Sequence, residues 1–374
     1  MTARRLKIGL ELHFLDGRVQ GLRTHCVEVF SRVVRSTPEI DFYCMMAKPE
    51  LLEKEGFTSP NVIPVPIRHS GRLQRYAFSI PSLVRKHKLD LLHCQFSAPP
   101  IVSCKTAITI HDILAETHPE YFGRMYRILA RMTQTIAVRH AIQIYTVSEY
   151  SRRKIARVYD IPENRITVLL NAVDEARFVP RADGHRNEIE NRGLVPGGYV
   201  LTVGRLEPRK NHKRLFEAYA RLRLPFAKPP LVVVGQKDFG YEEALKTIRD
   251  LDIQREVRLL EDVRNEELPR IYRNAKVFIY PSLAEGFGMP VLEAMASGVP
   301  VITSNNTALF EAAGDAAVLV EATNVESIAS GLEQLLKDPD ACATLVKRGH
   351  HHIRKFTWDK TAEVLRDSYI QLLQ

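Results

Sequence analysis

The feature that most constrains the fold is a regular alternation of short apolar runs with longer segments of helical periodicity. The first half of the chain contains six such runs: LKIGLEL, IDFYCMM, LDLLHC, TAITIHD, AIQIYTVS and RITVLLN. A helical pattern from about Arg23 to Ser36 separates the first two. Nearly continuous apolar runs are typical of strands buried on both faces of a parallel sheet, with helices as the crossovers. The first half is therefore predicted to be a doubly wound α/β domain.

The same alternation restarts after a break near residue 175. The stretch VDEARFVPRADGHRNEIENRGLVPGG is polar and contains two prolines and a Gly-Gly pair, which is typical of a linker. The runs YVLTVGR, PLVVVGQ, VRLL, AKVFIYPS and VPVITS follow it, again with helical segments between them. We predict two Rossmann-like domains, residues 1–175 and 176–355, facing a central cleft.

The last segment, residues 356–374, reads as an amphipathic helix. We expect it to pack back toward the N-terminal domain. Its candidate packing positions are Trp358, Val364, Leu365 and Tyr369.

Length and composition agree with a folded chain of two domains. The 374 residues exceed the roughly 250–300 at which a single hydrophobic core stops growing. Five cysteines are an odd number without C-x-x-C spacing, which argues against a disulfide framework or a zinc site and favours a reducing compartment. We find no signal-peptide pattern and no run of 18 apolar residues, so we expect a cytoplasmic protein.

The positive charge is confined to one half of the chain. Lys and Arg minus Asp and Glu give 26 − 17 = +9 for residues 1–180 and 27 − 27 = 0 for residues 181–374. Such an excess suits an anionic partner, for example anionic lipid, a phosphorylated substrate or nucleic acid. The alternative is a solvated face with unmatched arginines.

The stretch PSLAEGFGMPVLEAMASGVPVI, from Pro281 to Ile302, joins a predicted strand to a predicted helix. Gly286 and Gly288 allow a ligand to approach the backbone, and Pro290 suits the first turn of a helix. Amides at a helix start attract anions, so a phosphate is the expected guest.

Glu285 and Glu293 lie on either side of this turn. Free carboxylates would repel a phosphate, but they can accept hydrogen bonds from vicinal hydroxyl groups. A diphosphate flanked by two polyols, which is a nucleotide sugar, would satisfy both. The alternative is that neither glutamate binds a ligand: one would interact favourably with the helix dipole, and the other would be exposed to solvent.

A second motif, VGRLEPRKN, places Arg205 and Lys210 after a strand, at the edge where α/β sheets bind ligands. Two cations there can neutralise a diphosphate and stabilise it as a leaving group. Taken singly they could be surface charges, and the glutamate loop downstream makes the pair specific.

With these residues the chain resembles retaining GT-B glycosyltransferases of family four, which include bacterial mannosyl- and glucosyltransferases of polysaccharide synthesis. The resemblance covers nearly the whole chain and rests on Gly204-Arg205 with Lys210, on the E-x7-E motif with its G-F-G-M-P-V core, and on SGVPVI. It implies that Arg205 and Lys210 bind the donor diphosphate, that Glu285 contacts the transferred sugar and that Glu293 contacts the ribose. The remaining donor-binding residues implied are Gly204, Gly286, Phe287, Gly288, Met289, Pro290, Val291 and Gly21.

The resemblance extends into the first half. TIHDILAETHPEYF is similar to the H-D segment of mannosyltransferase-like members, which implies that His111 lies near the transferred sugar and that Asp112 orients its loop. TVSEYSRRKI makes Ser148 and Arg152 candidates on the acceptor side, although a helix cap at Ser148 is equally compatible with the pattern.

Two departures from the family pattern stand out. Gln20-Gly21 replaces the usual Gly-Gly pair, which puts amide contact with the donor in doubt. Asn171-Ala172-Val173-Asp174 replaces N-G-V-D, and alanine tolerates positive φ poorly. Asn171 is retained as an acceptor-side candidate.

We expect no metal ion, because no clustered His and Asp residues have ligand spacing. We also expect no cofactor. Protein cations would then stabilise the leaving group. The resemblance implies retention at the anomeric carbon without a protein base. The implied enzyme is a metal-independent hexosyltransferase, with a C-terminal domain that binds the nucleotide sugar. The donor favoured is GDP-mannose, and a UDP-hexose is also possible.

The acceptor is expected on the basic N-terminal domain. The segment FGRMYRILARMTQTIAVRH places Arg124, Arg127 and Arg131 at helical spacing among apolar residues. A helix of this kind could rest on an anionic bilayer at the inner face of the membrane, and a polyprenyl-diphosphate-linked glycan would be a fitting acceptor. An ordinary core-facing helix with arginines in water is the alternative.

The same residues bear on three other possible functions. A sugar-nucleotide 2-epimerase of similar fold would not be expected to show the Arg205, Lys210 and E-x7-E set together. An inactive sugar-nucleotide-binding subunit is disfavoured by the intact Glu285 and Glu293. Nucleic-acid binding, suggested by the basic charge, lacks any recognised module or aromatic stacking motif.

Overall fold

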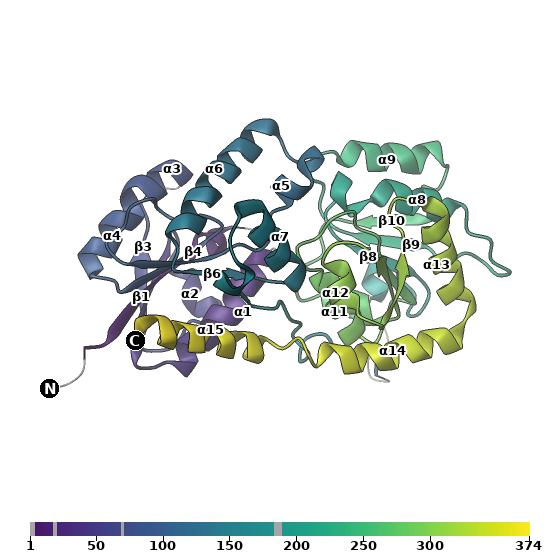
Figure 1. Ribbon diagram of the computed structural model, residues 1–374. Helices are drawn as coiled ribbons and strands as arrows, with labels where there is room; N and C mark the ends of the chain where they lie inside the picture. The colour runs from purple at the N-terminus through teal and green to yellow at the C-terminus, as the bar shows by residue number, and fades with distance from the viewer. Residues whose placement is uncertain (1–3, 18–20, 69–70, 183–188) are drawn as a thin grey trace. The chain divides into compact units, whose positions relative to one another are not determined.

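The computed structural model describes residues 4–17, 21–68, 71–182 and 189–374. Internal contacts divide the chain into two compact units. Unit 1 comprises residues 1–171 and 358–374, and unit 2 comprises residues 172–357 (Figure 1). Residues 183–188 of the predicted linker lie outside the described residues. The described part of that linker includes one short 3₁₀ turn, Glu190–Arg192.

Unit 1 is built on a sheet of seven parallel strands in the order β3-β2-β1-β4-β5-β6-β7. Six of its strands match the predicted apolar runs, and the edge strand β3, Val62–Pro66, was not among them. β1 pairs with β2 along the whole of β1, from Leu6 opposite Ile40 to Glu11 opposite Met45. The strands are β1 (Leu6–Glu11), β2 (Ile40–Met46), β3 (Val62–Pro66), β4 (Leu91–Gln95), β5 (Lys105–Thr109), β6 (Gln143–Thr146) and β7 (Ile166–Val168).

Helices cover this sheet, and one of them comes from the far end of the chain. The C-terminal helix α15 (Trp358–Leu373) packs against α1 (Gly21–Ser36) within unit 1. Trp358, Leu365 and Tyr369 are buried as predicted, but Val364 is 41% exposed, so its assignment to the packing face was wrong. The other helices are α2 (Leu51–Lys54), α3 (Arg72–Gln74), α4 (Ile80–His87), α5 (Leu114–Thr117), α6 (Arg124–His140) and α7 (Glu149–Tyr159).

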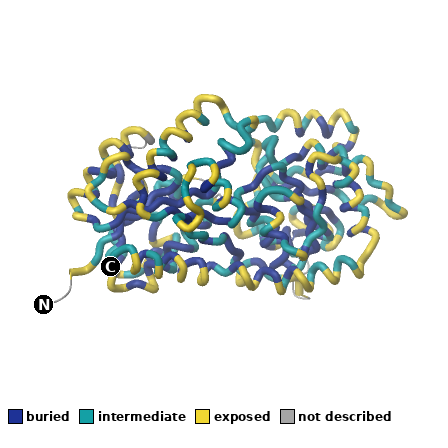
Figure 2. The backbone as a smooth tube through the Cα atoms, viewed as in Figure 1, coloured by how far each residue is buried: buried dark blue, intermediate teal, exposed yellow. Residues whose placement is uncertain are grey.

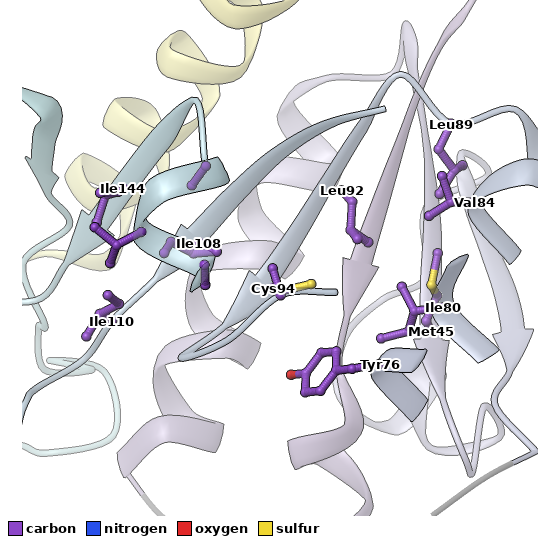
Figure 3. Packing of buried hydrophobic residues seen from close by; sticks show 14 of the residues in the cluster. Met45, Tyr76, Ile80, Val84, Leu89, Leu92, Cys94, Ile108, Ile110 and Ile144 are labelled. Carbon is purple, nitrogen blue, oxygen red and sulfur yellow. The ribbon is translucent and has the colours of Figure 1, made fainter. Parts of the chain in front are cut away.

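The core of unit 1 lies between the sheet and these helices. Leu92 and Cys94 of β4 and Ile108 of β5 project into it, and Ile80 and Val84 of α4 face them (Figure 3). Figure 2 shows most of the strand backbone as buried and much of the helix backbone as exposed, and the edge strand β3 has exposed residues. Burial on both faces explains why the strands read as continuous apolar runs.

Unit 2 repeats the design with six parallel strands in the order β10-β9-β8-β11-β12-β13. Its strands are β8 (Val200–Val203), β9 (Leu231–Val234), β10 (Val257–Leu260), β11 (Val277–Tyr280), β12 (Val301–Ser304) and β13 (Ala317–Val320). Its helices are α8 (His212–Ala220), α9 (Tyr241–Asp250), α10 (Leu268–Arg273), α11 (Met289–Ala296), α12 (Leu309–Ala313), α13 (Val325–Lys337) and α14 (Pro339–Ile353).

The strand order reverses once in each sheet, between β1 and β4 in unit 1 and between β8 and β11 in unit 2. Open α/β sheets bind ligands outside the carboxyl ends of the strands at such a reversal. In unit 2 the motif VGRLEPRKN follows β8 and the glutamate loop follows β11, so both predicted motifs lie at the reversal.

Candidate active site

The carboxylate of Glu285 is the centre of the unit 2 site. Its Oε1 accepts hydrogen bonds from Lys210 Nζ at 2.6 Å, Tyr280 Oη at 2.8 Å and Ser282 Oγ at 2.7 Å. Its Oε2 accepts one from Arg209 Nη1 at 2.7 Å. Each carboxylate oxygen has two lone pairs, so three donors crowd Oε1 while Oε2, with one donor, can accept a further hydrogen bond.

The surrounding backbone fixes this geometry by joining the two motifs. Arg209 and Lys210 lie in a 3₁₀ turn, Pro208–Lys210, whose Arg209 carbonyl accepts from Leu283 N at 2.8 Å and Ser282 Oγ at 3.0 Å. The Asn211 amide donates to the Pro281 carbonyl at 2.9 Å. The loop after β8 and the loop after β11 are therefore held against each other before any ligand binds.

Charged and hydrogen-bonding neighbours keep Glu285 ionised in spite of its burial. Burial alone would raise the pKa of its carboxyl, but the charges of Arg209 and Lys210, with the hydrogen bonds from Lys210 and Ser282, outweigh it, so the pKa falls from 4.5 to about 2. Burial lowers the pKa of Lys210 and the Arg209 charge adds to this, while Glu285 opposes both. Burial and the Glu285 charge raise the pKa of Tyr280 well above 10, so it stays a neutral donor.

Two glycines near the site are required for different physical reasons. Gly288 has φ of 118°, and a Cβ there would meet Leu309 Cδ2 at 2.6 Å, so no other residue fits without strain. Gly235 allows the close approach of its backbone to that of Gly204, because a Cβ on Gly235 would lie 1.9 Å from the Gly204 carbonyl oxygen, whereas a Cβ on Gly204 would make only ordinary contacts at 3.5 Å.

The start of α11 offers fewer amides than the sequence suggested. Pro290 has no N–H, and the Val291 N–H donates to the Gly288 carbonyl at 3.0 Å. The Phe287 side chain is buried against Phe356, with ring centroids 5.7 Å apart. An anion at this helix start would therefore depend on the amide of Met289 and the flanking glycines, Gly286 and Gly288.

Glu293 has its own surroundings, separate from those of Glu285. It lies on α11, where burial raises the pKa of its carboxyl, and the Tyr272 hydroxyl and the Arg177 charge oppose that rise. The two glutamates thus differ in the direction of their pKa shifts as well as in their partners.

Arg205 and Lys210, predicted as a pair, have different partners. Lys210 contacts Glu285, whereas Arg205 Nη1 contacts Asp238 Oδ2 at 2.6 Å and is 40% exposed. Arg209, which the sequence analysis did not single out, occupies the position beside Glu285 and also pairs with Glu207 at 2.6 Å. Its position next to Lys210 was the sequence feature that could have indicated this role. Tyr280 and Ser282 were also missed, although both stand at the carboxyl end of a strand.

In unit 1 the predicted residues His111 and Asn171 lie in one buried cluster. His111 Nε2 bonds the Gln95 amide oxygen at 2.8 Å, and its ring meets that of His25 edge to face at 4.9 Å. His25 Nδ1 in turn bonds Asn171 Oδ1 at 2.7 Å. Gln95, at the carboxyl end of β4, was missed, and its amide nitrogen is buried with no partner among the described residues.

These histidines are neutral near pH 7. Burial, reinforced by the charges of His25 and His93, lowers the pKa of His111 well below 6.5. Burial lowers the pKa of His25 to about 4 and that of His93 to about 3. Because the Gln95 oxygen can only accept, Nε2 of His111 carries the ring proton.

The other N-terminal candidates have local structural roles. Ser148 caps α7 by accepting from Ser151 N at 3.0 Å, and Asp112 accepts from Leu114 N at 3.1 Å in a turn. Arg152 pairs with Glu149 at 2.7 Å. Gly21 begins α1, and Gln20 beside it lies outside the described residues.

Within the described ranges, no group of three or more His, Cys, Asp or Glu side chains is placed to hold a metal ion. The sequence does contain two Asp-x-Asp tripeptides, Asp250-Leu251-Asp252 and Asp338-Pro339-Asp340, which the expectation of metal independence left out of account. Asp250 ends α9 and faces Lys246, and Asp338 caps α14. Both tripeptides thus belong to helix ends.

Comparison with known families agrees with this architecture. The model of "Glycosyl transferases group 1" matches residues 187–352, and that of "Glycosyltransferase Family 4" matches residues 19–177. O-antigen chain mannosyltransferase B of Escherichia coli is 31% identical over 267 residues, which cover 71% of this chain and 70% of that protein. O-antigen chain mannosyltransferase RfbU of Salmonella typhimurium is 25% identical over 353 residues, which cover 90% of this chain and 92% of that protein.

Solved structures show the same fold. Sucrose-phosphate synthase from Thermosynechococcus elongatus matches with a TM-score of 0.81 and 18% identity, over 98% of this chain and 99% of that one. Anabaena HepE in complex with UDP-glucose matches with a TM-score of 0.78 and 18% identity, over 98% and 100%.

The chain belongs to the family 4 glycosyltransferases and has the GT-B fold, which confirms the resemblance and the fold class predicted from the sequence. It is a glycosyltransferase. The comparisons give no support to the epimerase alternative.

Proposed function

We propose that this glycosyltransferase moves mannose from GDP-mannose to a glycan or a polyprenyl-diphosphate-linked acceptor in cell-surface polysaccharide synthesis, with retention and without a metal ion. The observation that carries the proposal is the ionised Glu285, held beside two protein cations where the sheet order of unit 2 reverses. The E. coli and Salmonella relatives are named as O-antigen mannosyltransferases, which supports mannose. The HepE complex with UDP-glucose keeps a UDP-hexose as the alternative donor.

Binding of a sugar at Glu285 is expected at Oε2. Three protein donors crowd Oε1, whereas among the described residues Arg209 alone donates to Oε2, so that oxygen keeps one lone pair for a sugar hydroxyl. Arg209 also pairs with Glu207, which holds it beside this oxygen. We propose that the sugar hydroxyl donates to Oε2 beside Arg209.

The leaving diphosphate would be stabilised mainly by Lys210. Its ammonium has three N–H groups, of which Tyr280 at 2.5 Å and Glu285 at 2.6 Å take two. The third can meet a phosphate oxygen, and the low solvent exposure of the side chain strengthens that contact. Arg205 would serve as an outer cation, since its Asp238 partner and greater exposure weaken its field.

No protein base is assigned. For a retaining reaction in which the departing phosphate oxygen takes the acceptor proton, the protein has only to hold the reactants in place. His111, neutral with its proton on Nε2, is proposed as a hydrogen-bonding group for the sugar, and Asp112, Ser148, Arg152 and Asn171 as supports of the acceptor region in unit 1. We further propose a cytoplasmic enzyme in peripheral contact with the inner face of an anionic membrane.

A donor screen tests the proposal. The purified protein is mixed with GDP-mannose, UDP-glucose, UDP-N-acetylglucosamine or UDP-galactose, each with and without EDTA, and thermal shift and sugar release are measured. Stabilisation and slow mannose release from GDP-mannose in EDTA are expected, with Glu285→Gln as the inactive control. Release from a UDP-hexose alone would reassign the donor, and release abolished by EDTA would contradict metal independence.

One further candidate remains open to the same screen. An inactive sugar-nucleotide-binding subunit would show stabilisation by a donor without release of the sugar or transfer. Retention itself is tested by the anomeric configuration of the product in proton NMR, where an inverted product would contradict the proposed mechanism.

A further inference from the structure

His13 of unit 1 has no part in the proposed function, although it lies where the order of the sheet reverses. It follows β1, which pairs with β4 at that reversal, and it begins a 3₁₀ helix, His13–Asp16. Its Nδ1 is hydrogen-bonded to Oε1 of Glu11, the last residue of β1. The Glu11 side chain is completely buried, whereas that of His13 is 22% exposed. The pair therefore joins a carboxylate inside the domain to an imidazole at its surface.

The buried Glu11 carboxylate is held by two residues of one helical segment. Arg75 Nε lies 3.4 Å from its Oε1, and Tyr76 Oη donates to its Oε2 at 3.4 Å. Both residues belong to a π-helix, Arg75–Ser79, and they are only 8% and 9% exposed. π-Helical turns are rare and occur frequently at functional sites, and a buried ion pair is weak evidence for stability. Two unfavourable features that meet at Glu11 therefore indicate a functional role.

The ion pair determines which nitrogen of His13 carries the ring proton. A carboxylate that is paired with a guanidinium only accepts hydrogen bonds, so Nδ1 of His13 donates to it. In the neutral imidazole, Nε2 is then a hydrogen-bond acceptor. No residue in the described part of the chain bonds Nε2. His13 thus has one acceptor atom of fixed direction that is left for a ligand.

The backbone on both sides of His13 is also fixed. Leu12 N donates to the Met45 carbonyl at 2.9 Å. Asp16, at the end of the 3₁₀ helix, accepts hydrogen bonds from the backbone amides of residues 47 and 48, each at 2.8 Å. The imidazole is therefore held in place before a ligand binds, which reduces the entropy lost on binding.

We propose that His13 binds the acceptor, with Nε2 accepting a hydrogen bond from a hydroxyl group of the acceptor sugar, and that Glu11 and Arg75 position its ring. The inference rests on the proposed function, because it names the acceptor chemistry that unit 1 recognises. His13 only holds the acceptor, and the proton of the reacting hydroxyl still goes to the departing phosphate oxygen.

A neutral sugar hydroxyl fits this site better than an anion does. An acceptor nitrogen requires a donor, and a phosphate dianion has no proton to donate. Arg75 offsets the charge of Glu11, so the cluster has no excess positive charge that would attract an anion. Gln95 ends the neighbouring strand β4, and its amide nitrogen is buried without a partner among the described residues. That amide can donate to a second oxygen of the same sugar.

The tautomer of His13 is tested without any substrate. Nitrogen-15 NMR of protein labelled in its histidine rings distinguishes protonated from unprotonated ring nitrogens at pH 8, and His13→Asn assigns the signals. We expect a protonated Nδ1 and an unprotonated Nε2. The opposite tautomer would overturn the proposal, because Nε2 would then be a donor.

Acceptor kinetics test the binding role. The protein is given the donor that it hydrolyses and the methyl α-glycosides of mannose, glucose, galactose and N-acetylglucosamine at pH 8, and the product is measured by mass spectrometry. His13→Asn keeps a donor for Glu11 but removes the acceptor at the Nε2 position. The KM for the glycoside that is used should therefore rise about tenfold, with little change in the rate at saturation. His13→Gln places an amide oxygen near the Nε2 position and should keep KM within about threefold of the native value.

His140 provides a matched control in the same unit. It is exposed, and its Nδ1 bonds the Ile136 carbonyl at 2.8 Å, so the same ring nitrogen is engaged as in His13. His140→Asn should leave the KM for the glycoside unchanged. A native KM in His13→Asn, or an equal rise in His13→Asn and His140→Asn, would overturn the proposal.

Donor hydrolysis without a glycoside separates this proposal from the proposed function. Both His13 variants should hydrolyse the donor at the native rate, because water does not need the contacts that hold an acceptor sugar. A native protein that hydrolyses the donor but glycosylates no member of the panel would overturn the role of His13 and leave the donor site standing. Loss of hydrolysis in His13→Asn would overturn it in favour of a general structural role. A native protein that hydrolyses no donor would contradict the proposed function and this inference with it.

Discussion

The Glu285 cluster of unit 2 and the His111 cluster of unit 1 are both buried polar groups beside strand carboxyl ends, but their charge states are opposite in kind. Glu285 is surrounded by Lys210 and Arg209, so burial leaves it ionised with a pKa of about 2. His111 has the neutral partners Gln95 and His25, so burial leaves it uncharged. The comparison shows that burial makes a charged group unfavourable and that the neighbouring groups determine whether it nevertheless stays charged.

This comparison indicates that electrostatic stabilisation of the reaction comes from unit 2. A group that stays charged in a dry site interacts strongly with a developing charge, whereas a neutral imidazole can only orient and hydrogen-bond. Substitutions in the two clusters should therefore differ in size and in pH behaviour.

The largest effect is expected for Glu285→Gln. The amide keeps the shape of the side chain but lacks the charge that Lys210 and Arg209 neutralise, so transfer should fall by about 10³-fold while nucleoside diphosphate binding changes little. Transfer is measured with labelled donor and binding by calorimetry. Glu285→Ala is the less clean variant, because it also removes the oxygen that accepts from the buried Lys210 ammonium and should cost about 3–5 kcal/mol of folding stability. A native transfer rate in Glu285→Gln would contradict the role of the cluster.

Lys210→Ala should have the next largest effect and should weaken both sugar transfer and nucleoside diphosphate binding. We expect transfer to fall by about 10²-fold and the nucleoside diphosphate to bind about tenfold more weakly, since one donor to the leaving group is lost. Arg205→Ala is the matched control. Its exposed, Asp238-paired guanidinium should matter less, and an equal loss in both variants would show that the two cations act as one unit.

Arg209→Gln should reduce transfer by about tenfold and change the acid stability of the protein. In the native protein the Glu285 pKa lies below 4.5, so its stabilising contribution is full above pH 4.5 and is lost as pH falls toward 2. A shift from 4.5 to about 2 corresponds to about 3 kcal/mol. Without Arg209 the pKa rises and this acid-dependent loss shrinks. Urea unfolding between pH 6 and pH 3 measures it, and identical pH profiles for the two proteins would refute the contribution of Arg209.

The smallest effect is expected in unit 1. His111→Gln keeps a hydrogen-bonding group next to Gln95, so transfer should fall only a few-fold, and the native rate should show no titration of His111 between pH 5.5 and 8 because its pKa lies well below 6.5. A loss comparable to that of Glu285→Gln, or a rate that follows a histidine titration near pH 6.5, would remove the distinction between the clusters.

The sequence predicted the repeated architecture well, because strands buried on both faces leave a pattern that needs no partner to be recognised. Pro290, predicted for the first turn of a helix, is the second residue of α11. The predicted boundary near 175 lies four residues beyond the point where the contacts divide the units. Val364 was misassigned because a helical stripe read from spacing alone does not locate its own edges.

Within the site, the sequence identified Glu285 and Lys210 but not the hydrogen bonds that the carboxylate accepts. Arg209 was missed because its role depends on the 3₁₀ turn that brings it next to Glu285, and that turn is set by contacts between two loops about 75 residues apart. The arginines of α6 suggested a helix that could rest on an anionic bilayer, but only the structure shows which side of this helix is buried. Nowhere in the described part of the chain is a helix both long enough and apolar enough to span a bilayer.

The most direct test of the central claim is the pKa of the Glu285 carboxyl in the folded protein. Carbon-13 NMR of protein labelled at the glutamate side-chain carboxyl, with Glu285→Gln to assign the signal, would follow it from pH 7 down to pH 4. We predict that the Glu285 signal does not titrate in this range, since its pKa is about 2. A midpoint at or above pH 4.5 would show that Arg209 and Lys210 do not hold the charge, and it would contradict the account.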